Sequence, residues 1–215
     1  MKVSNIIPYF KEELKGITDA REITAWAYLV IQYLLGLNRS DTIVYSNKVI
    51  SIKNSECIKR IISELKENKP IQYILGEAEF YGLKFKVNKH TLIPRPETEE
   101  LVDWILKEDF NSILDIGTGS GCIAISLAKS SSAQITAIDN CKKALEVAKE
   151  NAKLNKVNIK FCMQDILQST FLLNMDVIVS NPPYILESEK QNMKANVLQY
   201  EPHLALFTAD KDPLL

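Results

Sequence analysis

The tetrapeptide Asn181-Pro182-Pro183-Tyr184 has the composition of a site that holds an amino group. Proline has no backbone N–H and restricts the backbone, so this turn presents carbonyl oxygens as hydrogen-bond acceptors. The Asn181 side chain adds another acceptor oxygen, and the Tyr184 ring can stack on a flat group. Asn181 and a proline carbonyl can therefore bind both hydrogens of an NH2 group, which turns the nitrogen lone pair toward a neighbouring electrophile.

A glycine-rich turn, Gly117-Thr118-Gly119-Ser120-Gly121, comes earlier in the sequence and directly follows an apolar stretch. Its glycines let the backbone approach a ligand, and the helix expected after it offers free N–H groups. The G-x-G-x-G spacing is one residue shorter than the fingerprint of dinucleotide-binding folds, which disfavours a nicotinamide or flavin cofactor. The turn is interpreted as a ligand site, with a purely structural strand-to-helix turn as the alternative.

Two acidic residues follow the next two predicted strands. Asp139 comes 22 residues after Gly117, where a carboxylate can accept both hydroxyls of a ribose. Asp165 could bind the amino group of an adenine while Ile166 packs on the ring. Each acid alone could equally cap a helix. Because the carboxyl ends of parallel strands meet at one edge of a sheet, three such strand ends in series predict a nucleoside pocket.

The pattern from residue 97 onward is a regular alternation of strands and helices. We predict strands over 113–115, 135–138, 159–163 and 177–179, and helices over 97–107, 121–129 and 142–154. This alternation predicts an α/β fold, a parallel sheet with helices on both faces. Residues 175–179 are apolar enough to be buried on both faces, so we expect the C-terminal strands of this sheet to be missing from the sequence.

The first part of the chain is predicted to be helical. Ile6, Phe10 and Leu14 recur at helical spacing, a capping box at Asp19 precedes an apolar run over 23–37, and a third helix is expected over 55–67. Alternating residues after Glu77 predict a hairpin. We therefore expect three parts. They are a helical domain over 1–74, a hairpin linker over 75–90 and the sheet domain over 91–215.

Composition limits the classes of function. The 215 residues contain no apolar run long enough to cross a bilayer and no signal peptide, which predicts a cytoplasmic protein with no membrane partner. The four cysteines form no CxxC pair, and no metal site is expected. Residues 91–215 carry 12 Lys and Arg against 17 Asp and Glu. This acidic balance disfavours a nucleic acid as the direct substrate.

Together, the glycine-rich turn, the acid after the second strand and the Asn-Pro-Pro-Tyr turn resemble S-adenosylmethionine-dependent amino-methyltransferases. Four further stretches resemble the HemK/PrmC family of peptide chain release factor glutamine N5-methyltransferases, namely residues 70–76, 80–82, 92–99 and 200–206. The resemblance implies a Rossmann-like class I methyltransferase sheet preceded by a small helical domain. It also implies S-adenosyl-L-methionine as the cofactor and the GGQ-motif glutamine of release factors as the substrate, gripped by the helical domain.

The resemblance also assigns roles to residues. The cofactor turn falls on Gly117 to Gly121, the ribose carboxylate on Asp139 and the adenine side on Asp165 and Ile166. The catalytic motif falls on Asn181, Pro182, Pro183 and Tyr184, with Asn181 also touching the cofactor side. Residues 94–97 would lie over the site.

Three other functions remain open from the sequence. An Asn-Pro-Pro-Tyr turn serves the exocyclic amine of adenine equally well, so a DNA adenine-N6 methyltransferase is one. A methyltransferase of a ribosomal-protein glutamine is the second. The third is a truncated form that binds cofactor or release factor without turnover.

Overall fold

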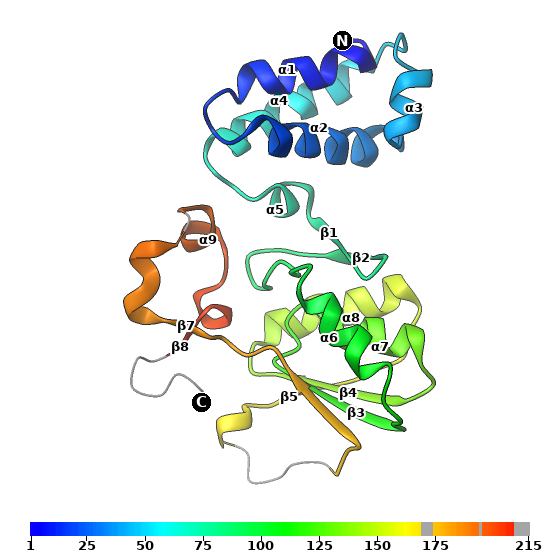
Figure 1. Ribbon diagram of the computed structural model, residues 1–215, viewed down its shortest axis with the longest axis vertical. Coiled ribbons are helices and arrows are strands. Elements are labelled where there is room, and N and C mark those ends of the chain that lie inside the picture. The colour runs from blue at the N-terminus through cyan, green and yellow to red at the C-terminus, as the bar shows by residue number, and fades with distance from the viewer. Residues whose placement is uncertain (169–173, 194, 209–215) are drawn as a thin grey trace. The chain divides into compact units, whose positions relative to one another are not determined.

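The computed structural model describes residues 1–168, 174–193 and 195–208, and the chain divides into two units at Leu75 and Gly76 (Figure 1). The predicted third part, 91–215, thus includes residues outside the described ones. No helix in these ranges is both long and apolar enough to span a membrane.

The first unit is helical. Its elements are a 3-10 helix η1 (Val3–Asn5) and the helices α1 (Ile6–Glu13), α2 (Ala20–Leu35), α3 (Arg39–Val44), α4 (Ile52–Lys66) and α5 (Ile71–Leu75). The predicted apolar stripe of α1 is confirmed, because Ile6, Phe10 and Leu14 are fully buried. Asp19 caps α2, since its carboxylate accepts the backbone N–H groups of Arg21 and Glu22, which is the first half of the predicted capping box. The Glu22 carboxylate accepts the Thr18 hydroxyl.

The helix α3 is an element that the sequence analysis did not predict. It has only six residues, too few for a periodic apolar stripe. A reciprocal capping box starts it instead. The Asn38 side chain accepts the Asp41 N–H at 2.9 Å, and the Asp41 carboxylate accepts the Asn38 N–H at 3.0 Å.

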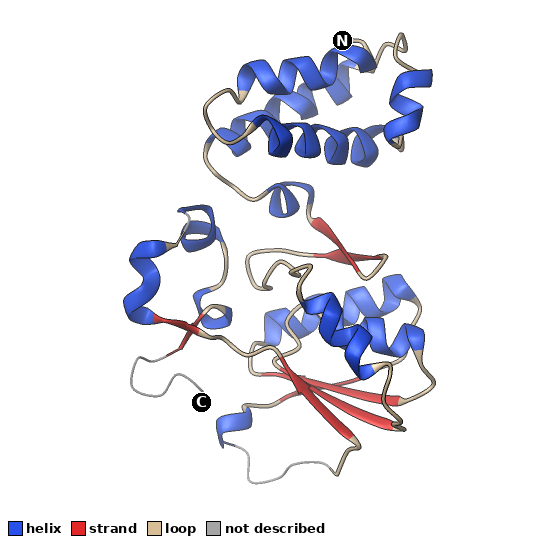
Figure 2. Cartoon of the chain, in the orientation of Figure 1, coloured by secondary structure: helices blue, strands red, loops and turns tan. Residues whose placement is uncertain are grey.

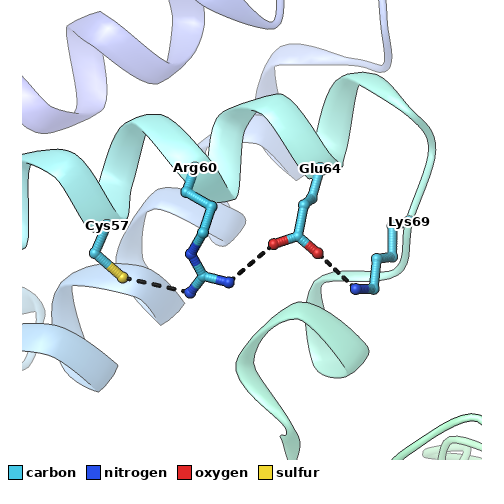
Figure 3. A network of polar contacts seen from close by, with 4 residues as sticks. All are labelled: Cys57, Arg60, Glu64 and Lys69. Carbon is cyan, nitrogen blue, oxygen red and sulfur yellow. Dashed lines mark hydrogen bonds and ion pairs between the residues drawn. The ribbon is translucent and has the colours of Figure 1, made fainter.

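The end of α4 is held by polar side chains (Figure 3). The Glu64 carboxylate pairs with Arg60 at 3.0 Å and with Lys69 at 2.5 Å, while Arg60 also reaches the Cys57 sulfur at 3.7 Å. Lys69 lies beyond the last helical residue, so the network joins the helix to the loop that follows. The pair with Arg60 is exposed on the arginine side and is expected to contribute less than about 1 kcal/mol, whereas the pair with Lys69 is half-buried.

The second unit begins with the predicted hairpin, formed by β1 (Glu77–Phe80) and β2 (Leu83–Lys86). Tyr81 and Gly82 have φ angles of 51° and 68°, the left-handed pair that a two-residue hairpin turn requires. The Tyr81 N–H donates to Glu99 at 2.8 Å and its hydroxyl donates to Asp103 at 2.6 Å. Both acids lie on α6 (Thr98–Ile105), so the hairpin turn is fixed to that helix.

The central sheet contains four described strands, all parallel, in the order β5-β4-β3-β6. The strands are β3 (Ser112–Ile116), β4 (Gln134–Asp139), β5 (Lys160–Met163) and β6 (Val177–Ser180). The helices α7 (Cys122–Ser130) and α8 (Lys142–Asn155) follow β3 and β4. The chain moves outward from β3 to β5 and then returns to the other side of β3. This change of direction creates the crevice in which open α/β sheets bind ligands.

The expectation of helices on both faces of the sheet is wrong for the described residues. Figure 1 shows α6, α7 and α8 on the same face. The connection from β5 to β6 spans only residues 164–176, and its described part forms the short 3-10 helix η2 (Ile166–Gln168). Ile178 on β6 consequently stays 49% exposed, although Val179 beside it is buried as predicted.

A small separate pair of strands follows β6. The strands β7 (Ile185–Leu186) and β8 (Phe207–Thr208) run parallel, with Ile185 opposite Phe207. Between them lie the 3-10 helix η3 (Glu187–Asn192), the helix α9 (Ala195–Tyr200) and the 3-10 helix η4 (His203–Ala205) (Figure 2).

One buried side chain of α8 joins three parts of the second unit. Asn151 is fully buried, its oxygen accepts the Lys86 N–H at 2.6 Å, and its nitrogen donates to the Lys86 carbonyl at 3.0 Å. The same nitrogen donates to the Ser120 carbonyl at 2.9 Å. Asn151 therefore pairs with β2 as another strand would and ties that strand to the glycine-rich turn.

Candidate active site

The glycine-rich turn leaves the carboxyl end of β3 in a left-handed path. Gly117, Gly119 and Gly121 have φ angles of 72°, 55° and 82°, values that side chains rarely tolerate. The backbone N–H groups of Gly117 and Thr118 both donate to the Ile138 carbonyl, at 2.9 and 3.0 Å. The end of β4 thus holds the turn in place.

Gly121 also allows two helices to approach each other. A Cβ atom at this position would lie 2.9 Å from Ile125 Cδ1 and 3.2 Å from Ala148 Cβ. Ile125 belongs to α7 and Ala148 to α8. The third glycine is therefore required by packing as well as by its backbone angle.

Asp139 ends β4 and lies against this turn. Its carboxylate is buried and accepts the Gly119 N–H at 2.8 Å through one oxygen and the Cys141 N–H at 2.8 Å through the other. A ribose acceptor and a helix cap were the two roles open to Asp139 from the sequence, and its carboxylate does hold the backbone that leads into α8. A carboxylate has about four acceptor positions, so two remain for ligand hydroxyls.

Asp165 and Ile166 follow β5 at the same edge of the sheet. The Asp165 carboxylate accepts the Leu167 N–H at 3.1 Å and the Gln168 side chain at 2.9 Å, an arrangement that starts η2. Ile166 is half-buried. The preceding residue, Gln164, donates its N–H to the Asp139 carbonyl at 3.0 Å, so the two predicted acids stand beside adjacent strand ends.

The Asn-Pro-Pro-Tyr turn follows β6, on the other side of β3. Asn181 is half-buried, and its Nδ2 donates to the Thr98 hydroxyl oxygen at 3.4 Å. The Ser180 hydroxyl donates to the Ile116 carbonyl at 2.9 Å, which joins the turn to the residue before Gly117. Tyr184 is 69% exposed. The predicted catalytic and cofactor residues thus all follow strand ends at one edge of the sheet.

Glu201, for which the sequence predicted no role, joins the segment after β7 to residues 93–95. Glu201 is 4% exposed, and its carboxylate pairs with the Arg95 guanidinium at 2.7 Å and lies 3.5 Å from the Ile93 backbone nitrogen. Two of the stretches on which the family resemblance rested are therefore joined by a buried ion pair.

Asp115, the last buried residue of β3, is another site residue that the sequence analysis did not single out. One of its oxygens accepts the Thr118 hydroxyl at 2.7 Å, and the other has no hydrogen-bond partner among the described residues. Burial raises the pKa of this carboxyl to about 6, although the Thr118 hydrogen bond opposes the rise.

This raised pKa predicts how stability depends on pH. The Asp115 carboxyl binds its proton more tightly folded than unfolded, so its stabilising contribution is complete below about pH 4 and is lost as the pH rises through about 6. Between pH 7 and pH 4, the unfolding free energy of the wild type should therefore gain about 2 kcal/mol relative to Asp115→Asn. Urea unfolding at four pH values measures the difference. A difference that stays constant with pH would contradict the assignment.

Other groups in the described residues do not extend this site. No cluster of three or more His, Cys, Asp or Glu side chains in these ranges is arranged to hold a metal ion. Burial raises the pKa of the Cys122 thiol to about 12, so this thiol stays protonated. A cavity of about 370 Å³ lies between β2 and α8 and contains none of the predicted site residues.

Known proteins match both units of the chain. Residues 96–203 match the family described as Methyltransferase small domain, and residues 7–76 match the family described as PrmC N-terminal domain. The Release factor glutamine methyltransferase of Flavobacterium psychrophilum is 48% identical, covering 100% of this chain and 79% of the relative. The protein of the same name from Bacteroides thetaiotaomicron is 43% identical, over 99% and 78%.

One further relative and one solved structure are similar to this chain. The Release factor glutamine methyltransferase of Streptococcus pneumoniae is 41% identical over 100% of this chain and 77% of its own length. A solved structure, the Pyrococcus abyssi tRNA (uracil-54, C5)-methyltransferase, is 22% identical with a TM-score of 0.43, over 49% of this chain and 27% of that protein.

Proposed function

The chain belongs to the family of release factor glutamine methyltransferases, and from this we propose how its site serves that reaction. The enzyme transfers a methyl group from S-adenosyl-L-methionine to the side-chain amide nitrogen of a release factor glutamine. Its sheet is of the Rossmann-like class, with the strand order β5-β4-β3-β6. The observation that carries the proposal is the meeting of the glycine-rich turn and the Asn-Pro-Pro-Tyr turn on neighbouring strands, β3 and β6.

The residues around the glycine-rich turn fit the chemical groups of this cofactor. S-adenosyl-L-methionine, when bound, supplies an electrophilic methyl group on a sulfonium. Residues 117–121 offer a backbone that a ligand can approach closely. Asp139 keeps acceptor capacity for ribose hydroxyls, and the unpartnered oxygen of Asp115 suits a cationic amino group. Asp165 and Ile166 are proposed for the adenine.

The Asn-Pro-Pro-Tyr turn is proposed to hold the glutamine amide. An amide nitrogen is a weak nucleophile, so the site must orient it. The Asn181 oxygen and the Pro182 or Pro183 carbonyl would each accept one hydrogen of the NH2 group, which aligns the lone pair and limits its motion. The same oxygens stabilise the positive charge that develops on the nitrogen. The methylated nitrogen is strongly acidic and releases its proton to water, so this turn needs no side-chain base.

The helical residues 1–74 are proposed to grip the release factor while its GGQ loop reaches the site. A protein substrate agrees with the acidic balance of residues 91–215, which would repel a nucleic acid. Because release factors act on ribosomes, we place the reaction in the cytoplasm.

The test is transfer of labelled methyl from S-adenosyl-L-methionine to a purified release factor. A parallel sample carries alanine in place of the GGQ glutamine, and further samples contain a DNA duplex or ribosomal proteins. Label should enter the unaltered release factor alone. Label that persists in the glutamine-replaced factor, or that enters only DNA or ribosomal proteins, would overturn the proposal. Cofactor binding without any transfer would also contradict it.

A further inference from the structure

Thr98, the first residue of α6, is the side chain that the structure places against the Asn181 amide. Its hydroxyl oxygen accepts a hydrogen bond from Asn181 Nδ2 at 3.4 Å. We propose that Thr98 is a positioning residue that holds this amide in place, with Nδ2 bound and Asn181 Oδ1 left for the substrate. The inference rests on the proposed function, because it concerns the atom that would receive the glutamine NH2.

The rotation matters because the two ends of an asparagine amide have opposite chemistry. Oδ1 only accepts hydrogen bonds, whereas Nδ2 only donates them. The substrate NH2 has hydrogens to donate, so only Oδ1 can hold it. A half-turn about the last side-chain bond of Asn181 would point two N–H groups at the substrate nitrogen instead. In the structure Nδ2 is bound to the Thr98 hydroxyl, which leaves Oδ1 for the substrate, and without this bond the amide is free to turn.

Thr98 is itself held from both sides along the chain. Its backbone N–H donates to the Arg95 carbonyl at 3.0 Å, and the Arg95 side chain pairs with the buried carboxylate of Glu201. On the other side, the Glu99 carboxylate accepts the Tyr81 N–H at 2.8 Å. The hydroxyl that faces Asn181 is thus carried by anchored backbone, which a positioning role requires.

Two substitutions distinguish the contribution of the Thr98 hydroxyl from that of the rest of its side chain. Thr98→Val keeps the shape and removes the oxygen, whereas Thr98→Ser keeps the oxygen and removes a methyl group. We expect Thr98→Val to lower kcat about fivefold to tenfold, with the KM values for cofactor and release factor within twofold. Thr98→Ser should retain at least about half of the wild-type kcat, which a purely structural role for Thr98 would not predict.

Ser131→Ala is the matched control. This substitution removes a hydroxyl that donates to the Leu127 carbonyl at the C-terminal end of α7, far along that helix from the glycine-rich turn. It should leave kcat unchanged. Thermal unfolding of all three variants shows whether the fold is retained.

Three results would overturn the inference. They are a wild-type kcat in Thr98→Val, equal losses in Thr98→Val and Thr98→Ser, or a loss confined to KM. In each case the kcat and KM of the variant are compared with those of a wild type that methylates the release factor glutamine. Failure of the proposed function is distinct, because the wild type itself would then transfer no methyl group to that glutamine.

Discussion

Replacing Asn181 with alanine should lower the rate of release factor methylation by at least about a hundredfold, the loss typical when a site loses a group that stabilises developing charge. The affinity for S-adenosyl-L-methionine should change less than threefold, because the cofactor is proposed to rest mainly on Gly117–Gly121 and Asp139. Single-turnover transfer of labelled methyl measures the rate, and calorimetry measures the affinity.

Asn111→Ala is the control for this experiment. Asn111 is exposed and precedes β3, at the opposite edge of the sheet, so its side chain should not affect the reaction. An unchanged rate in Asn181→Ala would remove Asn181 from the mechanism. A loss of cofactor affinity as large as the loss of rate would instead make Asn181 a cofactor residue.

Gly121→Ala should lower the free energy of unfolding by about 3 kcal/mol. Part of the loss comes from the φ angle of 82°, which disfavours any side chain, and part from the close approach to Ile125 and Ala148. The measurement is urea unfolding followed by circular dichroism.

Gly82→Ala separates these two causes. Gly82 also has a left-handed backbone, with φ at 68°, but a Cβ there meets no atom within 4 Å. Gly82 lies in the same unit, and Gly82→Ala should lower the free energy of unfolding by only about 1 to 2 kcal/mol. Equal losses in both variants would mean that the contact between α7 and α8 carries no part of the effect.

The sequence predicted the elements whose apolar residues repeat over several turns or strand positions. The predicted helix over 142–154 corresponds to Lys142–Asn155, and the predicted strand over 135–138 to Gln134–Asp139. Burial of one helix face or of a whole strand leaves a regular pattern. Short helices such as Arg39–Val44 leave none, because six residues do not complete two turns.

The candidate site was predictable where local sequence carries the chemistry. Glycines after a strand, an acid after the next strand and a proline turn each have a local signature. Thr98 and Glu201 have none, since their roles depend on partners far away in the sequence. Thr98 meets Asn181 across 83 positions, and Glu201 meets Arg95 across 106. The role of Asp115 was not predictable for another reason. The sequence shows that Asp115 ends a buried strand, but not that one of its carboxylate oxygens lacks a hydrogen-bond partner.

The contact between Asn151 and β2 makes the backbone amide proton of Lys86 a probe of the glycine-rich turn. The Lys86 N–H bonds to a side chain of α8 instead of a neighbouring strand, so its exchange with deuterated solvent reports the separation of hairpin and helix. Asn151 also holds the Ser120 carbonyl. A ligand that stiffens the glycine-rich turn should therefore slow hydrogen exchange at the Lys86 amide, so the exchange rate of this amide reports binding of the cofactor.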